Sequence, residues 1–241
     1  MAKFFRTHGT ESALLLVIAV ISLILSLITD RYFTIGNAFD LLNTSSVNII
    51  FAVGLLVVLI SGGIDISFAV AASVVQYGTA LFVGWIGGGD WAIGLMVAGG
   101  LGSLLGTINA GLIQAFGIPS IVVSISSFNA FFGLLMFFTK GVSIYDLPDW
   151  LTAHVALYER QLADGSWIEI SLLLLVMFIC VVATWALVSR TTIGRQLYAF
   201  GDNPEGARRF GVNIAAMRFI AFGWLGLMAG IAGLVQAHYA Q

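Results

Sequence analysis

The sequence is poor in charge. Asp, Glu, Lys and Arg make up only 9% of its 241 residues, whereas an ordinary soluble domain carries about 25%. Hydrophobic residues reach 59%, and the mean hydropathy is +1.02. Several apolar runs are long enough to cross a bilayer, which takes about 20 residues. This composition excludes a soluble enzyme and predicts a membrane protein.

Cysteine pairs, excess charge and a nucleotide site are also missing. The single cysteine, Cys180, lies in an apolar run, so it forms no disulfide within the chain and is expected to serve packing. A formal net charge of −2 gives no support to a nucleic acid partner. No Gly-x-x-x-x-Gly-Lys-Ser/Thr segment occurs, so the chain cannot hydrolyse ATP alone. The three histidines lack partners at ligand spacing, and we expect neither catalytic residues nor a metal site.

Seven apolar runs predict an all-α polytopic membrane protein, with some segments broken or re-entrant. The runs are Ser12–Ile28, Val47–Ile64, Ile66–Gly88, Trp91–Gly117, Pro119–Phe138, Ile168–Ser189 and Ala216–Ala237. The first run has no small-residue cleavage site after it, so we interpret it as an uncleaved anchor helix. Because no repeat or low-complexity tract divides the chain, residues 1–241 are predicted to form a single transmembrane domain.

Basic residues predict the orientation, since Lys and Arg in short loops are retained in the cytoplasm. If every run crosses, seven of the ten basic residues fall on the side of the N-terminus. That arrangement places the N-terminus and the loop 190–213 in the cytoplasm, and the loop 139–167 outside. The outer loop is the longest polar stretch. It fits a lid, a docking surface or a solvated connection.

The second and third runs meet without a loop, at Ser61-Gly62-Gly63-Ile64-Asp65-Ile66-Ser67. Paired glycines break a helix, and Asp65 or Ser67 can cap the next helix by accepting from its free N–H groups. An aspartate that faces lipid at mid-bilayer costs roughly 2.5–3.5 kcal/mol, so Asp65 is expected to face protein, water or the interface. Two interpretations stay open: a tight interfacial turn with a helix cap, and a place on the transport path.

Small residues form ridges in two runs. Gly102, Gly106 and Ala110 recur every four residues in the fourth run, and Gly226 with Gly230 repeats the pattern in the last. Such ridges let two helices approach closely, so packing is the default interpretation.

Three polar residues in the runs are further candidates for the transport path. Asn109 lies beside the first ridge, where it either bonds a partner helix or contacts a ligand. Ser124 and Asn129 follow Gly117-Ile118-Pro119-Ser120, where Pro119 is placed to start a helix. Their side chains either line a polar path or bond back to carbonyls of their own helix.

The most informative stretch runs from Gly201 to Gly211. Its residues suit successive positions of a very short helix: Asn203 the N-cap, Pro204 the first position, Glu205 the first turn, Arg208 and Arg209 the last turn, and Gly211 the closing left-handed position. Two turns are too few to be stable alone in water. The stretch is therefore either a helix that needs a docking partner or a structured loop whose arginines enforce topology.

These residues resemble the coupling-helix signature of permease subunits of bacterial ABC importers for ribose, xylose and related monosaccharides. Two further stretches are similar to the same family and follow in family order: Gly62-Gly63-Ile64-Asp65-Ile66-Ser67, and Gly106-Thr107-Ile108-Asn109 followed by Gly117-Ile118-Pro119-Ser120-Ile121-Val122. The three motifs spread over roughly residues 50–237. Three motifs in order make the resemblance specific.

The resemblance implies a multi-pass chain in the bacterial inner membrane, surrounded by lipid. Two permease chains, identical or different, would form the pathway, ATPase subunits would bind ATP and Mg beneath them, and an extracytoplasmic binding protein would deliver the solute. No cofactor is implied for this chain itself. Position by position, the resemblance implies that the residues docking into the ATPase are Asn203, Pro204, Glu205, Gly206, Ala207, Arg208, Arg209 and Gly211, and that Asp65, Ser67 and Asn109 lie near the core.

Some positions depart from the family. Gly206 stands where Ala is commoner, which should loosen the short helix by up to about 1 kcal/mol. The sequence stops at Gln241, before a further set of spans, so it resembles a C-terminally shortened member of a family with about ten spans. Two other classes stay open: an ion-coupled secondary carrier, which broken helices and Asp65 also suit, and a non-transporting membrane scaffold.

Overall fold

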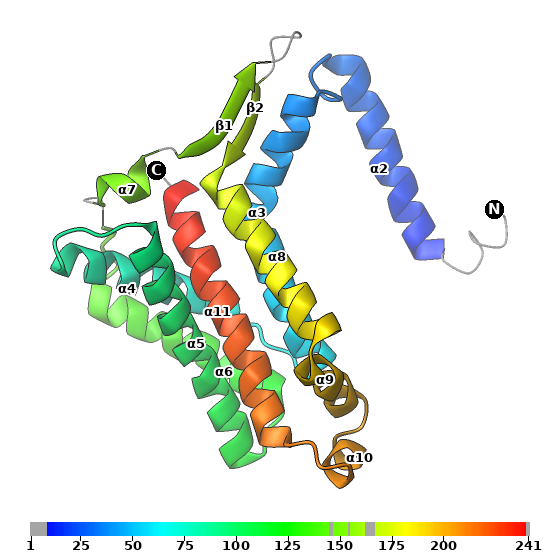
Figure 1. Ribbon diagram of the computed structural model, residues 1–241, viewed down its shortest axis with the longest axis vertical. Coiled ribbons are helices and arrows are strands. Elements are labelled where there is room, and N and C mark those ends of the chain that lie inside the picture. The colour runs from blue at the N-terminus through cyan, green and yellow to red at the C-terminus, as the bar shows by residue number, and fades with distance from the viewer. Residues whose placement is uncertain (1–8, 145–146, 154, 162–166, 240–241) are drawn as a thin grey trace. The chain divides into compact units, whose positions relative to one another are not determined.

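The computed structural model describes residues 9–144, 147–153, 155–161 and 167–239, and most of them are helical (Figure 1). The chain falls into two compact units, residues 1–44 with 156–172 and residues 45–155 with 173–241, and the single domain over residues 1–241 stays a prediction. The elements are α2 (Gly9–Ile28), α3 (Ile35–Ile60), α4 (Phe68–Trp85), α5 (Trp91–Phe116), α6 (Ser120–Thr139), α7 (Asp149–Thr152), β1 (Ala156–Gln161), β2 (Trp167–Ser171), α8 (Leu172–Arg190), α9 (Thr192–Asp202), α10 (Pro204–Arg209) and α11 (Ile214–Tyr239).

Six of the described helices are long and apolar enough to cross a membrane, namely α3, α4, α5, α6, α8 and α11. The helix α2 adds a shorter apolar stretch, Ser12–Ile28. Each of these seven helices overlaps one of the seven apolar runs, so the prediction of an all-α polytopic membrane protein is confirmed. Of the predicted outer loop 139–167, residues 145–146, 154 and 162–166 lie outside the described part of the chain.

Two predicted boundaries are wrong. The helix α3 begins at Ile35 rather than at Val47, because the Thr34 hydroxyl just before it accepts from the Asn37 N–H at 3.2 Å and caps its first turn. The run predicted from Ile168 begins in a strand, and helix α8 starts only at Leu172. The alternation of apolar and polar residues over residues 168–171 favours a strand.

The first unit contains α2, the start of α3 and a hairpin. Strands β1 and β2 pair antiparallel, with Glu159 opposite Glu169. The Ser171 hydroxyl donates to Asn43 Oδ1 at 2.7 Å, which ties the end of β2 to α3. At the other end of the unit, the hydroxyl groups of Ser22 and Tyr32 are 2.9 Å apart and link α2 to the turn that follows it.

The second unit is organised around α11. In its most apolar window 61% of the residues are buried, against 17–33% for the other five spans. Figure 1 shows α11 between α5 and α8. On the α8 side, Cys180 belongs to a buried cluster with Met228 and Val235, which confirms its expected packing role. The Trp224 indole also donates to the Thr184 hydroxyl at 3.1 Å.

On its other side, α11 contacts α5 backbone to backbone. A Cβ atom added at Gly102 would lie 2.1 Å from the Gly226 carbonyl oxygen, and one added at Gly106 would lie 2.1 Å from the Phe222 carbonyl oxygen. Real Cβ atoms are not found at such distances, so only glycine allows this approach. The predicted small-residue ridges are therefore confirmed as the seam between α5 and α11.

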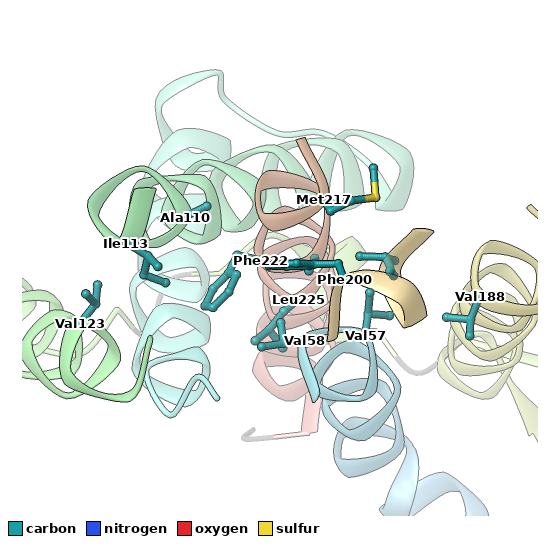
Figure 2. Close-up of a cluster of buried hydrophobic side chains, with 12 residues drawn as sticks. Val57, Val58, Ala110, Ile113, Val123, Val188, Phe200, Met217, Phe222 and Leu225 are labelled. Carbon is teal, nitrogen blue, oxygen red and sulfur yellow. The ribbon is translucent and has the colours of Figure 1, made fainter. Parts of the chain in front are cut away.

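A buried apolar cluster ties α9 to the spans (Figure 2). Leu197 and Phe200 of α9 belong to it. The spans contribute Val57 and Val58 from α3, Ala110 and Ile113 from α5, Val123 from α6, Val188 from α8, and Met217, Ala221, Phe222 and Leu225 from α11. The helix α9 is thus part of the core rather than a loose connection.

The seam between α5 and α11 can be tested with Gly106→Ala. Because the new Cβ meets backbone that cannot move aside alone, the variant should lose about 1–3 kcal/mol of stability. Thermal unfolding in detergent measures this loss. Gly100→Ala is the matched control, since a Cβ at Gly100 has nothing within 4 Å among the described residues. Equal melting temperatures for the two variants would contradict the seam.

Candidate functional site

The predicted helix break is present between α3 and α4, over residues 61–67. Gly62 has φ +75°, a backbone conformation that favours glycine, and the N–H of Gly63 closes α3 by donating to the Val58 carbonyl at 3.0 Å. The end of α9 packs directly on this point, because a Cβ atom at Gly201 would lie 1.9 Å from the Ile60 carbonyl oxygen. The break therefore carries the contact between the spans and α9.

Three predicted site residues meet in one buried network. The side chains of Asp65, Ser67 and Asn109 are 3%, 1% and 1% exposed. Ser67 donates to Asp65 Oδ1 twice, from its backbone N–H and from its hydroxyl, both at 2.7 Å. The Asn109 amide of α5 donates to Asp65 Oδ2 at 3.1 Å and to the Ser67 hydroxyl at 2.8 Å. The network fastens the break to α5.

The predicted side-chain cap of α4 takes a different form. Ser67 occupies the N-cap position, but its hydroxyl makes no capping hydrogen bond. The hydroxyl oxygen accepts from the Asn109 amide instead. Asp65 in turn accepts from the backbone N–H of Ser67, outside the helix, instead of from a free N–H in the first turn of α4. The expected cap is therefore replaced by a turn that the carboxylate stabilises.

The network leaves little room for a solute. The void beside Asp65, Ser67 and Asn109 measures about 10 Å³, enough for at most one water molecule. Asn109 Oδ1 faces no hydrogen-bond partner among the described residues. In this conformation the three side chains bind one another and hold a sharp backbone turn. Their place on the transport path stays a prediction.

Ser124 and Asn129, both on α6, lie outside this network. The Ser124 hydroxyl donates to the Ile121 carbonyl at 3.0 Å, and the Asn129 amide donates to the Ile125 carbonyl at 2.8 Å. Both side chains therefore follow the second interpretation, bonding back to their own helix. Another polar residue of α6 does reach the break, since the Ser120 hydroxyl accepts the Ile64 N–H at 2.9 Å.

The short helix α10 has the predicted ends. Asn203 Oδ1 accepts from the Gly206 N–H at 2.9 Å, and Pro204 is in the first helical turn. At the other end Gly211 has φ +82°, and the Val212 N–H donates back to the Ala207 carbonyl at 3.0 Å. Arg208 and Arg209 lie in the last turn as expected. Both ends of α10 are thus fixed by local hydrogen bonds.

One face of α10 is buried and the other is open. Ala207 is buried against the protein, whereas Phe210, just after the helix, is 92% exposed. Glu205 and Arg209 lie on the exposed surface as an ion pair, 3.5 Å apart. A pair this exposed contributes little stability. The exposed face of α10 consists of Glu205, Arg208, Arg209 and Phe210.

The second unit contains two sizeable cavities, one beside the break and one distant from α10. One of about 330 Å³ lies where the break, the α5–α6 turn and α10 meet, lined among others by Gly62, Ser120 and Pro204. The other, of about 530 Å³, lies between α4 and α6 and includes Gln76 and Tyr77. Sequence reasoning missed this second site. The only sequence signal for it was a pair of polar residues inside an apolar run.

The network of Asp65 predicts a measurable cost for Asp65→Asn. An amide at this position turns one of the accepting oxygens into a donor that faces another donor, so the variant should lose about 1–3 kcal/mol of stability. Asp90→Asn is the control: exposed Asp90 caps α5 by accepting from the Ile93 N–H at 2.9 Å, and Asn caps equally well. Thermal unfolding in detergent should separate the two. A shift as small for Asp65→Asn as for Asp90→Asn would contradict a stabilising network.

Comparison with known proteins identifies the chain's relatives. The family described as "Branched-chain amino acid transport system / permease component" matches residues 37–241. The chain is 30% identical over 239 residues to the "Autoinducer 2 import system permease protein LsrC" of Photorhabdus luminescens, covering 98% of this chain and 68% of that one. The LsrC protein of Yersinia pestis (strain Pestoides F) is also 30% identical, with 98% and 64% covered.

The chain thus spans about two thirds of the length of these relatives. No solved structure matches it. The family match includes all three motifs and six helices able to span a membrane. The resemblance drawn from the motifs is confirmed, and the chain belongs to this family of membrane-spanning permease components of transport systems.

Proposed function

We propose that the chain is the transmembrane subunit of an ATP-driven importer for a monosaccharide or similar small polar solute. The relatives support the direction, because their names describe an autoinducer 2 import system, and the motifs that resemble monosaccharide permeases support the solute class. The chain would work with a second permease chain, with ATPase subunits that bind ATP and Mg, and with an extracytoplasmic binding protein. The N-terminus and α10 would then face the cytoplasm.

The observation that carries this proposal is the exposed face of α10. A helix of six residues is unstable alone, yet this one is capped at both ends and anchored by buried Ala207. What it presents outward is two arginines, a glutamate and an almost fully exposed phenylalanine. Arginine and aromatic residues are enriched among the residues that dominate binding energy at protein interfaces. This face suits a groove on an ATPase subunit.

The contacts behind α10 offer a route for the coupling. Gly201 of α9 lies against the end of α3, and Phe200 packs with Val58 of α3 and Phe222 of α11 in the buried cluster (Figure 2). A displacement of α10 would therefore reach the break directly. When ATP closes the ATPase pair, the docked helices of the two permease chains would move together, and the pathway would change the side to which it opens.

Charge reversal on α10 tests the docking. Arg208→Glu combined with Arg209→Glu should reduce ATP-driven solute uptake to background, because two negative charges would take the place of the arginines that dock on the ATPase subunit. Membrane insertion should persist. Arg195→Glu is the control, since Arg195 is also exposed but belongs to α9. Uptake is measured in cells with the complete system. Uptake at the wild-type rate in the double variant would refute the proposal.

The energy source of uptake, ATP or an ion gradient, can be tested in the same cells. Collapsing the proton and sodium gradients should leave uptake intact while ATP is maintained. An ion-coupled carrier would behave in the opposite way.

The cap of α10 gives an independent test. Asn203→Ala removes the hydrogen bond to the Gly206 N–H and should destabilise the short helix by about 1 kcal/mol, with a severalfold loss of uptake. Asn203→Asp keeps an accepting oxygen and should restore uptake, since aspartate is an equally good N-cap. Co-purification with the ATPase subunit should follow the same order. Equal uptake by Asn203→Ala and Asn203→Asp would mean that the cap does not support docking.

A further inference from the structure

The cavity of about 530 Å³ lies far from α10. Its lining includes Ala237, close to the end of α11, whereas α10 precedes the first residue of that helix. At a rise of about 1.5 Å per residue, the two places are separated by about 35 Å along α11. The volume lies within the range of small-molecule sites. The cavity therefore has the size of a solute site and the position of an entrance opposite α10.

One face of α4 supplies three of the polar side chains that line the cavity, and Thr139 and Ser143 supply two more. Ser73, Gln76, Tyr77 and Ala80 follow the spacing i, i+3, i+4 and i+7, which places them along one stripe of the helix. Ser73 bonds only weakly to its own helix, with its hydroxyl 3.4 Å from the Ala69 carbonyl. Gln76 and Tyr77 form no hydrogen bond with any described residue. Their amide and phenol groups are available to a ligand.

The helix α7, which follows the lining residue Leu147, is held by contacts of Trp150 and Leu151. Leu147 lines the cavity, and Trp150 of α7 follows closely in the chain. The Trp150 ring fills the place above Gly94, where an added Cβ would be 2.6 Å away, and stands edge-on to Trp91 at 5.5 Å. The carbonyl of Leu151 lies 2.7 Å from Nδ1 of His238. The described residues after Leu147 are therefore held in place, which favours binding over collapse of the space.

We propose that this cavity binds the transported solute as a neutral, polyhydroxylated molecule of monosaccharide size, with Gln76 and Tyr77 as its hydrogen-bond partners. This inference rests on the proposed function and deepens it. An amide both donates and accepts, as does a phenol, so the pair matches hydroxyl groups that also do both.

The same lining disfavours an amino acid. Among the described residues of the cavity none is charged. A branched-chain amino acid, the solute class in the family's description, would bring an ammonium and a carboxylate into a mostly apolar space without counter-charges. The described lining thus favours a neutral solute over an amino acid.

Uptake by a cavity variant tests the site. In the complete system, Gln76→Leu combined with Tyr77→Phe should lower ATP-driven uptake of D-ribose and of autoinducer 2 about tenfold, because two hydrogen bonds to the solute are lost. Assembly with the ATPase and basal ATP hydrolysis should stay at wild-type level, which a merely structural role would not allow. Gln236→Leu is the control, the same exchange at an exposed position of α11 outside the cavity.

Solute protection tests the cavity without ATP. Val142→Cys adds a thiol to its wall, and D-ribose or autoinducer 2 should slow modification by a membrane-impermeant maleimide, whereas L-leucine should not. Ile86→Cys, exposed at the end of α4 and outside the cavity, should react at one rate throughout. The native Cys180 is buried and stays unmodified.

The two assays separate the inference from the proposed function. Protection by neither hydroxylated solute, protection by L-leucine, or uptake unchanged in the double variant would overturn the cavity assignment, even where uptake remains ATP-driven. Uptake that does not depend on ATP would overturn the proposed function, while protection of Val142→Cys would still support the cavity.

Discussion

An interrupted helix in a membrane protein must find protein partners for its free backbone groups and for any charge beside them. In this chain the interruption covers residues 61–67, and Asp65 lies within it. Hydrogen bonds within the turn and hydrogen bonds to two other helices satisfy these groups. The carboxylate accepts from Ser67 within the turn and from Asn109 on α5, while the Ser120 hydroxyl of α6 accepts the N–H of Ile64. Three helices are fixed relative to one another by these bonds, and the packing of the second unit depends on them.

The same turn explains why glycine is required at two separated positions. Gly62 takes a positive φ so that the chain can leave α3, and Gly201 has no side chain because the Ile60 carbonyl occupies that space. The last carbonyls of α3 therefore lie against the end of α9. Since α9 shares its buried face with α3 and α11, the segment that carries α10 is built into the core. Short-range glycine contacts thus join the exposed helix to the membrane-spanning part.

How much of this was predictable depends on the range of the interactions. The ends of α10 follow from Asn203, Pro204 and Gly211, whose preferences act within one turn, and these predictions were correct. The pairing of Asp65 with Asn109 joins residues 44 positions apart and depends on how α5 is rotated about its axis, which no local pattern records. The cavity at Gln76 was missed for the same reason, because its walls come from α4, α6 and the segment after α6. The start of α3 was missed because hydropathy alone reads polar helical turns as a loop.

The helix α4 connects these features. Its first residues follow the network of Asp65 and Ser67, and the stripe with Gln76 and Tyr77 faces the cavity from the middle of the helix. An 18-residue helix is about 27 Å long and moves largely as a rigid rod. A rotation at the break that leaves α4 intact would therefore displace the polar stripe of the cavity. The hydrogen bonds among Asp65, Ser67 and Asn109 oppose such a rotation at the first turn of α4, so the buried network sets how the polar stripe faces the cavity.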